Sequence, residues 1–204
     1  MEKIASIFAK KLTISSRCDS LFLKIAVGYL LLPYFLFFWG WLRLPIALIF
    51  ILVFLFSYWL FIKQTDRDFP NQERFSIPWI VIIVCLLLVG VWLLYSGVGH
   101  FADQVGDYKK HNLILAHLIN QDWPIIQKLT DKSAYILVYY LAYYLPAGLV
   151  GKLFGLYIAN VFQYFFSLLG VSLSIYFVFS LVGHRKLLGV AVVFLLFGGM
   201  DILG

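Results

Sequence analysis

Long apolar segments constrain this chain more than any other feature. Uncharged runs occupy residues 25–41, 44–62, 77–95 and 157–182, and a further one begins at Leu187. Because a helix rises ~1.5 Å per residue, each complete run comes near the ~20 residues that cross the hydrocarbon core of a bilayer. A water-soluble domain does not need so much apolar surface. The sequence therefore predicts an all-α fold, a polytopic bundle of membrane helices.

The composition agrees with this class and limits the range of functions. Hydrophobic residues make up 63% of the 204 residues and charged residues 13%. The formal net charge is +6, but lysine and arginine occur in short loops between the apolar runs and are not concentrated in one soluble patch. That distribution is typical of residues that orient a chain in the membrane. It argues against nucleic acid as a partner.

The loops divide the chain into four segments. Residues 1–24 are basic, and they are expected to form an amphipathic helix on the cytoplasmic surface or, equally, a frayed tail. Residues 25–95 are expected to form three transmembrane helices and residues 157–204 two further ones. Between them, residues 96–156 are expected to form an extracytoplasmic loop with juxtamembrane helices. The chain stops at Gly204, soon after an apolar run, which is compatible with its being the first part of a longer protein.

The path of residues 133–151 decides the topology. This segment is apolar, but it is rich in tyrosine, which prefers the headgroup level, and it is interrupted by proline and glycine. If it crosses the membrane, Arg185 and Lys186 lie outside. If it lies at the interface, or dips in and returns, most of the sixteen lysine and arginine residues lie in the cytoplasm. The positive-inside rule favours this second path, which places Asp107 and Asp201 on the same outer face.

Charged and polar residues gather in the loop that follows the third run. Five of its residues fall at i, i+3, i+4, i+7 and i+11, which is one stripe of a helix: Asp107, Lys110, His111, Ile114 and Leu118. The stripe begins with acid and base and ends apolar. This pattern suits a helix that lies at a membrane surface, and we expect the chemistry of the protein in this loop.

Several short motifs resemble the first part of GT-C superfamily glycosyltransferases, such as the lipid A aminoarabinose transferases and the protein mannosyltransferases. VGDYKKHN around Asp107 is similar to their first outward loop, which carries an acid near its start. The turn QDWP at 121–124, the ending KLFG at 152–155 and the acid Asp201 also have counterparts in that family. The resemblance covers residues 77–204. Many members have a second acid where this chain has a glycine beside Asp107, and a proline after the later acid.

The distribution of lysine and arginine places the N-terminus in the cytoplasm, and the resemblance implies an enzyme of a bacterial plasma membrane. Such an enzyme moves a sugar from a polyprenyl-phosphate donor, whose lipid tail stays in the bilayer, to an acceptor on the outer side. It implies two catalytic carboxylates, Asp107 and Asp201. A carboxylate at the surface would take or orient the proton of the acceptor hydroxyl. The resemblance leaves a divalent metal open and implies no other cofactor.

The residues after Asp107 are the predicted ligands of the substrate: Lys109, Lys110, His111 and Asn112. The cations would stabilise the departing phosphate. Each of these residues also has an ordinary interpretation. Lysines anchor helices to lipid headgroups, histidine is common at an interface, and asparagine caps helices. Asp107 itself could be a solvated loop residue.

The rival class is a transporter or flippase, or a non-catalytic membrane assembly protein. Transporters place acids and broken helices near the middle of the bilayer, whereas the predicted spans up to Val182 contain no acid. Residues 187–200 would form a helix of ~21 Å, shorter than a hydrocarbon core of ~30 Å. We therefore predict that Asp201 lies below the outer surface, beneath Asp107, and that both carboxylates border one outward-open cavity.

Overall fold

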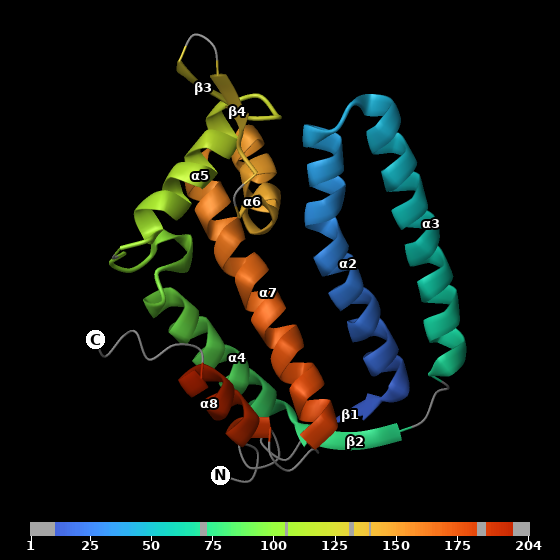
Figure 1. Ribbon diagram of the computed structural model, residues 1–204. Helices are drawn as coiled ribbons and strands as arrows, with labels where there is room; N and C mark the ends of the chain where they lie inside the picture. The colour runs from blue at the N-terminus through green and yellow to red at the C-terminus, as the bar shows by residue number, and fades with distance from the viewer. Residues whose placement is uncertain are drawn as a thin grey trace.

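The computed structural model describes residues 11–69, 73–104, 106–130, 133–138, 140–182 and 187–197. Most of them are helical, and the elements follow one another as shown in Figure 1. The long helices are α2 (Ser16–Trp41), α3 (Leu44–Asp68), α4 (Trp79–Tyr95) and α7 (Leu156–Val182). The shorter ones are the 3₁₀ helix η1 (Val98–His100), α5 (Tyr108–Asn120), α6 (Leu141–Phe154) and α8 (Leu187–Phe197). The predicted all-α helical bundle is confirmed.

Two short antiparallel strand pairs complete the described residues. β1 (Lys11–Ser15) pairs with β2 (Glu73–Pro78), and β3 (Ile126–Thr130) pairs with β4 (Ser133–Ile136). The first pair lies at the lower end of the bundle in Figure 1 and the second at its upper end. The strands therefore connect helices at the two ends of the molecule and contribute no layer of their own.

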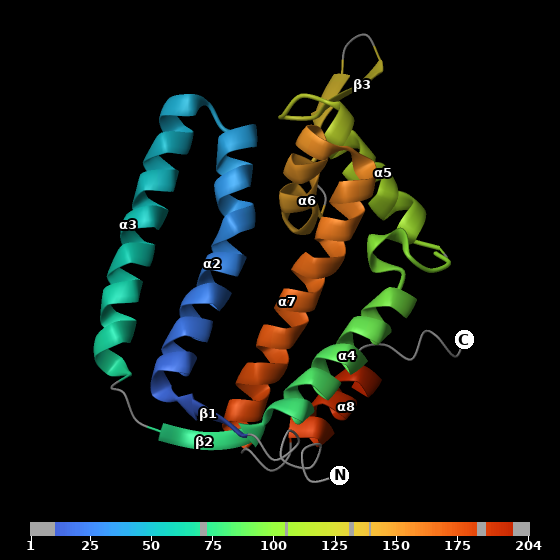
Figure 2. The same ribbon diagram turned by 180° about the vertical axis from the view of Figure 1, so that it is seen from behind.

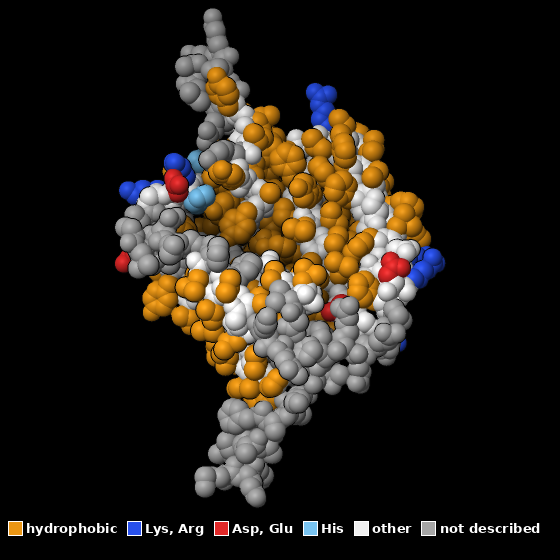
Figure 3. Space-filling model, turned by 60° about the horizontal axis from the view of Figure 1, so that its bottom comes forward, with side chains coloured by type: hydrophobic (Ala, Val, Ile, Leu, Met, Phe, Trp, Pro, Cys, Tyr) orange, Lys and Arg blue, Asp and Glu red, His pale blue; other side chains and the backbone are white. Residues whose placement is uncertain are grey.

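Three of the described helices are long and apolar enough to cross a membrane: Ser16–Trp41, Leu44–Asp68 and Leu156–Leu181. The apolar windows of α2 and α3 are almost entirely unburied within the protein, and hydrophobic side chains cover much of the face in Figure 3. Apolar surface of this extent is stable in contact with lipid and unstable in water. These features fit a multi-pass membrane protein.

The chain changes direction at each end of the bundle. Figures 1 and 2 show α2 and α3 as an antiparallel pair, and α4 and α7 as a second pair beside it. α5 and α6 lie at the upper end, together with the β3–β4 pair. α6 ends where α7 begins, so the segment between β4 and α7 enters the bundle and returns to the same end. At ~1.5 Å per residue, the 14 residues of α6 form a helix too short to cross a hydrocarbon core of ~30 Å.

The core at the upper end joins α5 to α6. Its buried residues are apolar side chains of α5, of α6 and of the turn between them: Ile114, Leu118, Ile125, Leu141 and Leu145. Gly151 allows this contact, because a Cβ added there would lie 2.5 Å from Ile119 Cδ1. The indole Nε1 of Trp41 donates a hydrogen bond to Leu137 O at 3.0 Å. α5 is therefore held against α6. α2 is tied by this hydrogen bond to the segment just before α6, and Leu36, Phe37 and Trp41 of α2 pack against the same core.

α2 begins at Ser16, well before the predicted start at residue 25. Residues 11–15 of the predicted N-terminal segment form β1, and residues 1–10 lie outside the described part of the chain. The early start brings Asp19 into a candidate span, whereas the predicted spans up to Val182 contain no acid. Asp19 is buried and accepts a hydrogen bond from Tyr176 Oη of α7. It lies in the first turn of α2, far from the middle of the helix.

Cysteine labelling can test the path of α6. In a protein whose Cys18 and Cys85 are replaced by alanine, we expect Lys109→Cys and Lys152→Cys to react with an impermeant maleimide from one side of the membrane. Arg67→Cys should react from the other side, because α3 ends at the opposite end of the bundle. If Lys152→Cys instead reacts from the side of Arg67→Cys, α6 crosses the membrane.

Candidate functional site

The side chain of Gln104 forms hydrogen bonds that hold the loop between α4 and α5 in place. Its Nε2 donates to Gly97 O at 2.6 Å, and its Oε1 accepts from Asn112 Nδ2 at 2.5 Å. His100 Nδ1 lies 2.7 Å from the same Oε1. Asn112, a predicted substrate ligand, thus ties α5 to the preceding loop, so its side chain is already engaged in the structure.

Tyr108 fixes the first turn of α5 to the end of α4. Its hydroxyl donates to Ser96 O, and its ring lies edge-on to that of His111 at 6.0 Å between centroids. Burial, followed by the nearby Tyr143, raises the pKa of the Tyr108 phenol. Tyr108 therefore stays protonated at neutral pH and can keep donating this hydrogen bond.

Asp107 immediately precedes α5 and projects into solvent. Its carboxylate accepts a hydrogen bond from Lys110 Nζ at 2.9 Å, and both side chains are largely exposed. The hydrogen bond from Lys110 and the charge of Lys110 hold the pKa of the Asp107 carboxyl below its usual range, with a smaller contribution from the charge of His111. The carboxylate is therefore ionised at neutral pH. Because exposed ion pairs contribute little to stability, Lys110 can turn to another anion at small cost.

His111 lies one turn into α5 on the inner side of this charged pair. Its ring stacks on Tyr144 of α6, with 5.7 Å between centroids and 26° between planes. Among the described residues its buried Nδ1 has no hydrogen-bond partner. Burial is the main reason why the pKa of the Tyr144 phenol lies well above its ordinary value, and Tyr143 and Tyr108 raise it further. The imidazole thus lies against the neutral phenol of Tyr144, and its buried Nδ1 is left without a hydrogen bond to any residue that the structure describes.

Beneath His111, a buried polar contact joins α6 to α7. Tyr143 Oη lies 2.5 Å from Ser167 Oγ, which donates to Gln163 O at 2.8 Å. Gln163 is only 3% exposed. Its Oε1 has no hydrogen-bond partner within the described ranges. Polar groups buried in this way between membrane helices are costly, which makes them candidates for function.

This aromatic and polar layer is absent from the expectations based on the sequence. The tyrosines of 133–151 are expected at the headgroup level, and Gln163 has no predicted role. The sequence does contain one indication of this layer. Gln163 and Ser167 are four positions apart (i and i+4) inside an apolar run, which places them on the same face of the helix.

The surface around α5 combines charge with a hydrophobic hollow. Figure 3 shows acidic, basic and histidine side chains gathered at the side where α5 lies, next to a hollow lined by hydrophobic side chains. The loop before α5 also forms an open depression of about 640 Å³. Its lining residues are Tyr95, His100, Phe101, Ala102 and Asp103. A polar ligand with an apolar tail would find both kinds of surface here.

The structure brings three of the predicted site residues together: Asp107 and Lys110 as an ion pair, and His111 beside them. Lys109 is exposed on the same turn. Asp201 lies outside the described residues, and so does the predicted cavity between the two carboxylates. No three histidine, cysteine, aspartate or glutamate side chains of the described ranges are placed to hold a metal ion.

Comparison of this chain with protein families, with characterised proteins and with solved structures gives no match.

Proposed function

We propose that this protein is a membrane glycosyltransferase of the GT-C type, which moves a sugar from a polyprenyl-phosphate donor to an extracytoplasmic acceptor. One observation carries the proposal. Asp107 and Lys110 form an ion pair at the start of a short helix, with His111 beside them. This helix is packed at one end of helices long and apolar enough to cross a membrane. A donor of this class needs both environments, because its phosphate is charged and its tail is hydrocarbon.

The chemistry requires a proton acceptor and a cation. The oxygen of the acceptor hydroxyl attacks the anomeric carbon of the sugar, the bond from that carbon to the phosphate oxygen breaks, and the hydroxyl proton passes to the Asp107 carboxylate. Lys110 stabilises the negative charge on the departing lipid phosphate. Lys109 is the second cation in reach of the same surface. No step needs a metal ligand from the described residues.

The ion pair gives this mechanism an order of events. While Lys110 donates to Asp107, the low pKa of the carboxyl makes it a weak base. When a phosphate draws Lys110 away, Asp107 loses both the hydrogen bond and much of the positive charge that lowered its pKa. Binding of the donor therefore strengthens the base at the moment when the acceptor must be deprotonated.

Orientation is part of the proposal. We infer that α5 and α6 face the outside of a bacterial plasma membrane and that the N-terminus faces the cytoplasm. The distribution of lysine and arginine along the sequence supports this orientation. The return of α6 to the end where it started is compatible with it.

Binding of the donor phosphate provides a direct test. Lys110→Gln should weaken binding of polyprenyl phosphate roughly tenfold, the effect of losing one hydrogen bond to a charged group. Affinity can be measured by native mass spectrometry on the protein in phosphatidylcholine nanodiscs. Arg43→Gln is the matched control, because Arg43 is an exposed cation at the same end of the bundle and away from α5. Equal affinities of the wild-type protein and the Lys110 variant would make Lys110 a headgroup anchor.

A further inference from the structure

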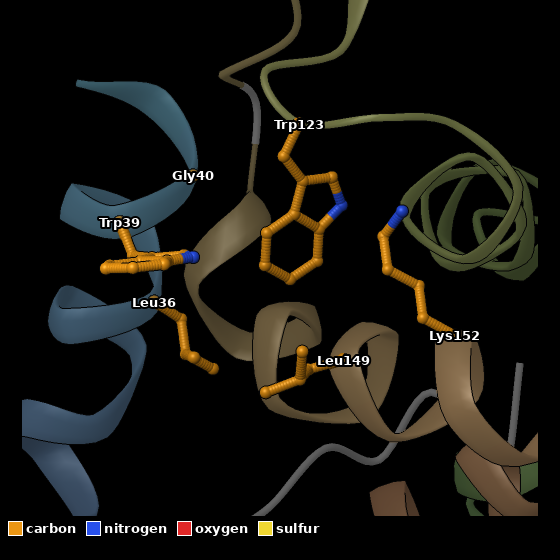
Figure 4. Close-up of a pocket in the computed structure, with 6 residues that line it drawn as sticks. All are labelled: Leu36, Trp39, Gly40, Trp123, Leu149 and Lys152. Carbon is orange, nitrogen blue, oxygen red and sulfur yellow. The ribbon is translucent and has the colours of Figure 1, made fainter. Parts of the chain in front are cut away.

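A second cavity lies on the other side of the upper end, between α2, α6 and the turn after α5. It has a volume of about 450 Å³. Figure 4 shows its lining: Leu36, Trp39 and Gly40 of α2, Leu149 and Lys152 of α6, and Trp123 from the turn. The cavity is largely apolar, and Lys152 is its one charged lining residue. It shares no lining residue with the group around Asp107.

Trp123 forms a fixed wall of this cavity. Its Nε1 donates to Leu118 O at 2.9 Å, and its ring lies 5.4 Å from that of Trp41. Gly40 lets the indole seat against α2, since a Cβ at that position would lie 2.7 Å from Trp123 Cε3. The packing of Trp123 against α2 therefore fixes the shape of the cavity on this side.

Lys152 holds a positive charge at the mouth of the cavity. Its Nζ donates to Gln121 O at 2.5 Å and lies 5.5 Å from the centre of the Trp123 ring. It forms no ion pair within the described part of the chain. An ammonium group has three donors, so it can bind an anion while it keeps the contact to the Gln121 carbonyl.

We propose that this cavity binds a phospholipid with an anionic headgroup, its phosphate on Lys152 and one acyl chain in the cavity. The lining matches hydrocarbon, and tryptophan is enriched where hydrocarbon meets headgroups. Trp39 and Leu149 are 63% and 39% exposed, and Trp39 belongs to α2, which is long and apolar enough to cross a membrane. A chain can therefore enter the cavity from the bilayer along α2. The cavity is too small to hold more than about one turn of a partner helix. The proposal does not depend on sugar transfer.

Photo-crosslinking can test this site in the intact protein. The probe is phosphatidylglycerol with a diazirine on one acyl chain, diluted into phosphatidylcholine nanodiscs. We expect cross-links in α2 and α6 at residues that line the cavity. Lys152→Gln should lower their yield roughly fivefold, because one lysine near an anionic lipid contributes about 1 kcal/mol. Lys152→Arg should retain the yield, and so should Arg43→Gln, which removes a cation that does not line the cavity.

Two further arms identify the source of the phosphate. Phosphatidylcholine with the same diazirine should cross-link less and should not respond to Lys152→Gln. Free glycerol phosphate in excess should not compete with the probe. The proposal is overturned if glycerol phosphate displaces the probe, if Lys152→Gln has no effect, or if cross-links spread evenly over the exposed face of α3.

Discussion

Asp107→Asn is expected to lower the rate of sugar transfer by roughly 10²-fold or more, because a positioned base contributes about that much. Asparagine keeps the size of the side chain and removes its ability to take a proton. The rate should be measured with purified protein, a polyprenyl-phosphate sugar and a soluble acceptor. Folding should be unaffected, since the Asp107 side chain is exposed.

Asp103→Asn is the matched control for this variant. Asp103 is another exposed acid of the same loop and lines the open depression before α5. It is not the proposed base, so its replacement should lower the rate much less than Asp107→Asn. Equal losses in the two variants would point to the charge of the loop as a whole. An unchanged rate in Asp107→Asn would remove the proposed base.

The pH profile gives the same prediction a second readout. Because Lys110 lowers the pKa of Asp107, the carboxylate should remain ionised until the pH falls below the ordinary aspartate value of about 3.9. The acidic limb of the kcat/KM profile, which reports the free enzyme, should therefore move to higher pH in Lys110→Gln, where the contact that lowers the pKa is lost. If the acidic limb of the profile does not move in Lys110→Gln, a group other than Asp107 determines its pH.

Leu118→Ala should destabilise the protein by about 2–5 kcal/mol, the usual cost of truncating a buried leucine in a packed core. Leu118 is fully buried and joins α5 to Leu141 and Leu145 of α6. The loss should appear as a lower Tm in detergent and as faster hydrogen exchange across α5. Transfer should fall as well, because α5 carries the proposed site.

Leu113→Ala provides the comparison within the same helix. Leu113 is 59% exposed, and surface substitutions usually change stability by no more than about 0.5 kcal/mol. A similar loss of stability in both variants would show that α5 does not depend on its buried face.

The helices that the sequence predicts best are those whose own composition determines them. The run at 157–182 corresponds to α7 at Leu156–Val182, and the stripe that begins at Asp107 corresponds to α5 at Tyr108–Asn120. In both segments the apolar residues repeat within the element itself. The predicted start of α2 is too late because charged residues before residue 25 argue against a membrane helix. In the structure such a residue has a partner in another element: Lys24 pairs with Asp66 of α3.

The charged part of the candidate site could also be predicted, whereas its inner layer could not. Asp107 and Lys110 stand one helical turn apart in the sequence, so their ion pair follows from local geometry. The stacking of His111 on Tyr144 requires α6 to fold back beneath α5. The sequence favours a segment 133–151 that stays at one side of the membrane, but no local pattern sets Tyr144 opposite His111.

The pairing of β1 with β2 has a consequence for the order in which the protein is made. It joins the chain before α2 to the chain before α4, in a register that sets Lys11 opposite Pro78. Both α2 and α3 lie between β1 and β2 in the chain, so β1 has no partner strand until α3 has been synthesised. The two strands can meet only when α2 and α3 have folded into an antiparallel pair that returns the chain to the end where α2 begins (Figure 1). The β1–β2 pair therefore depends on the antiparallel arrangement of α2 and α3, and it secures that arrangement once it has formed.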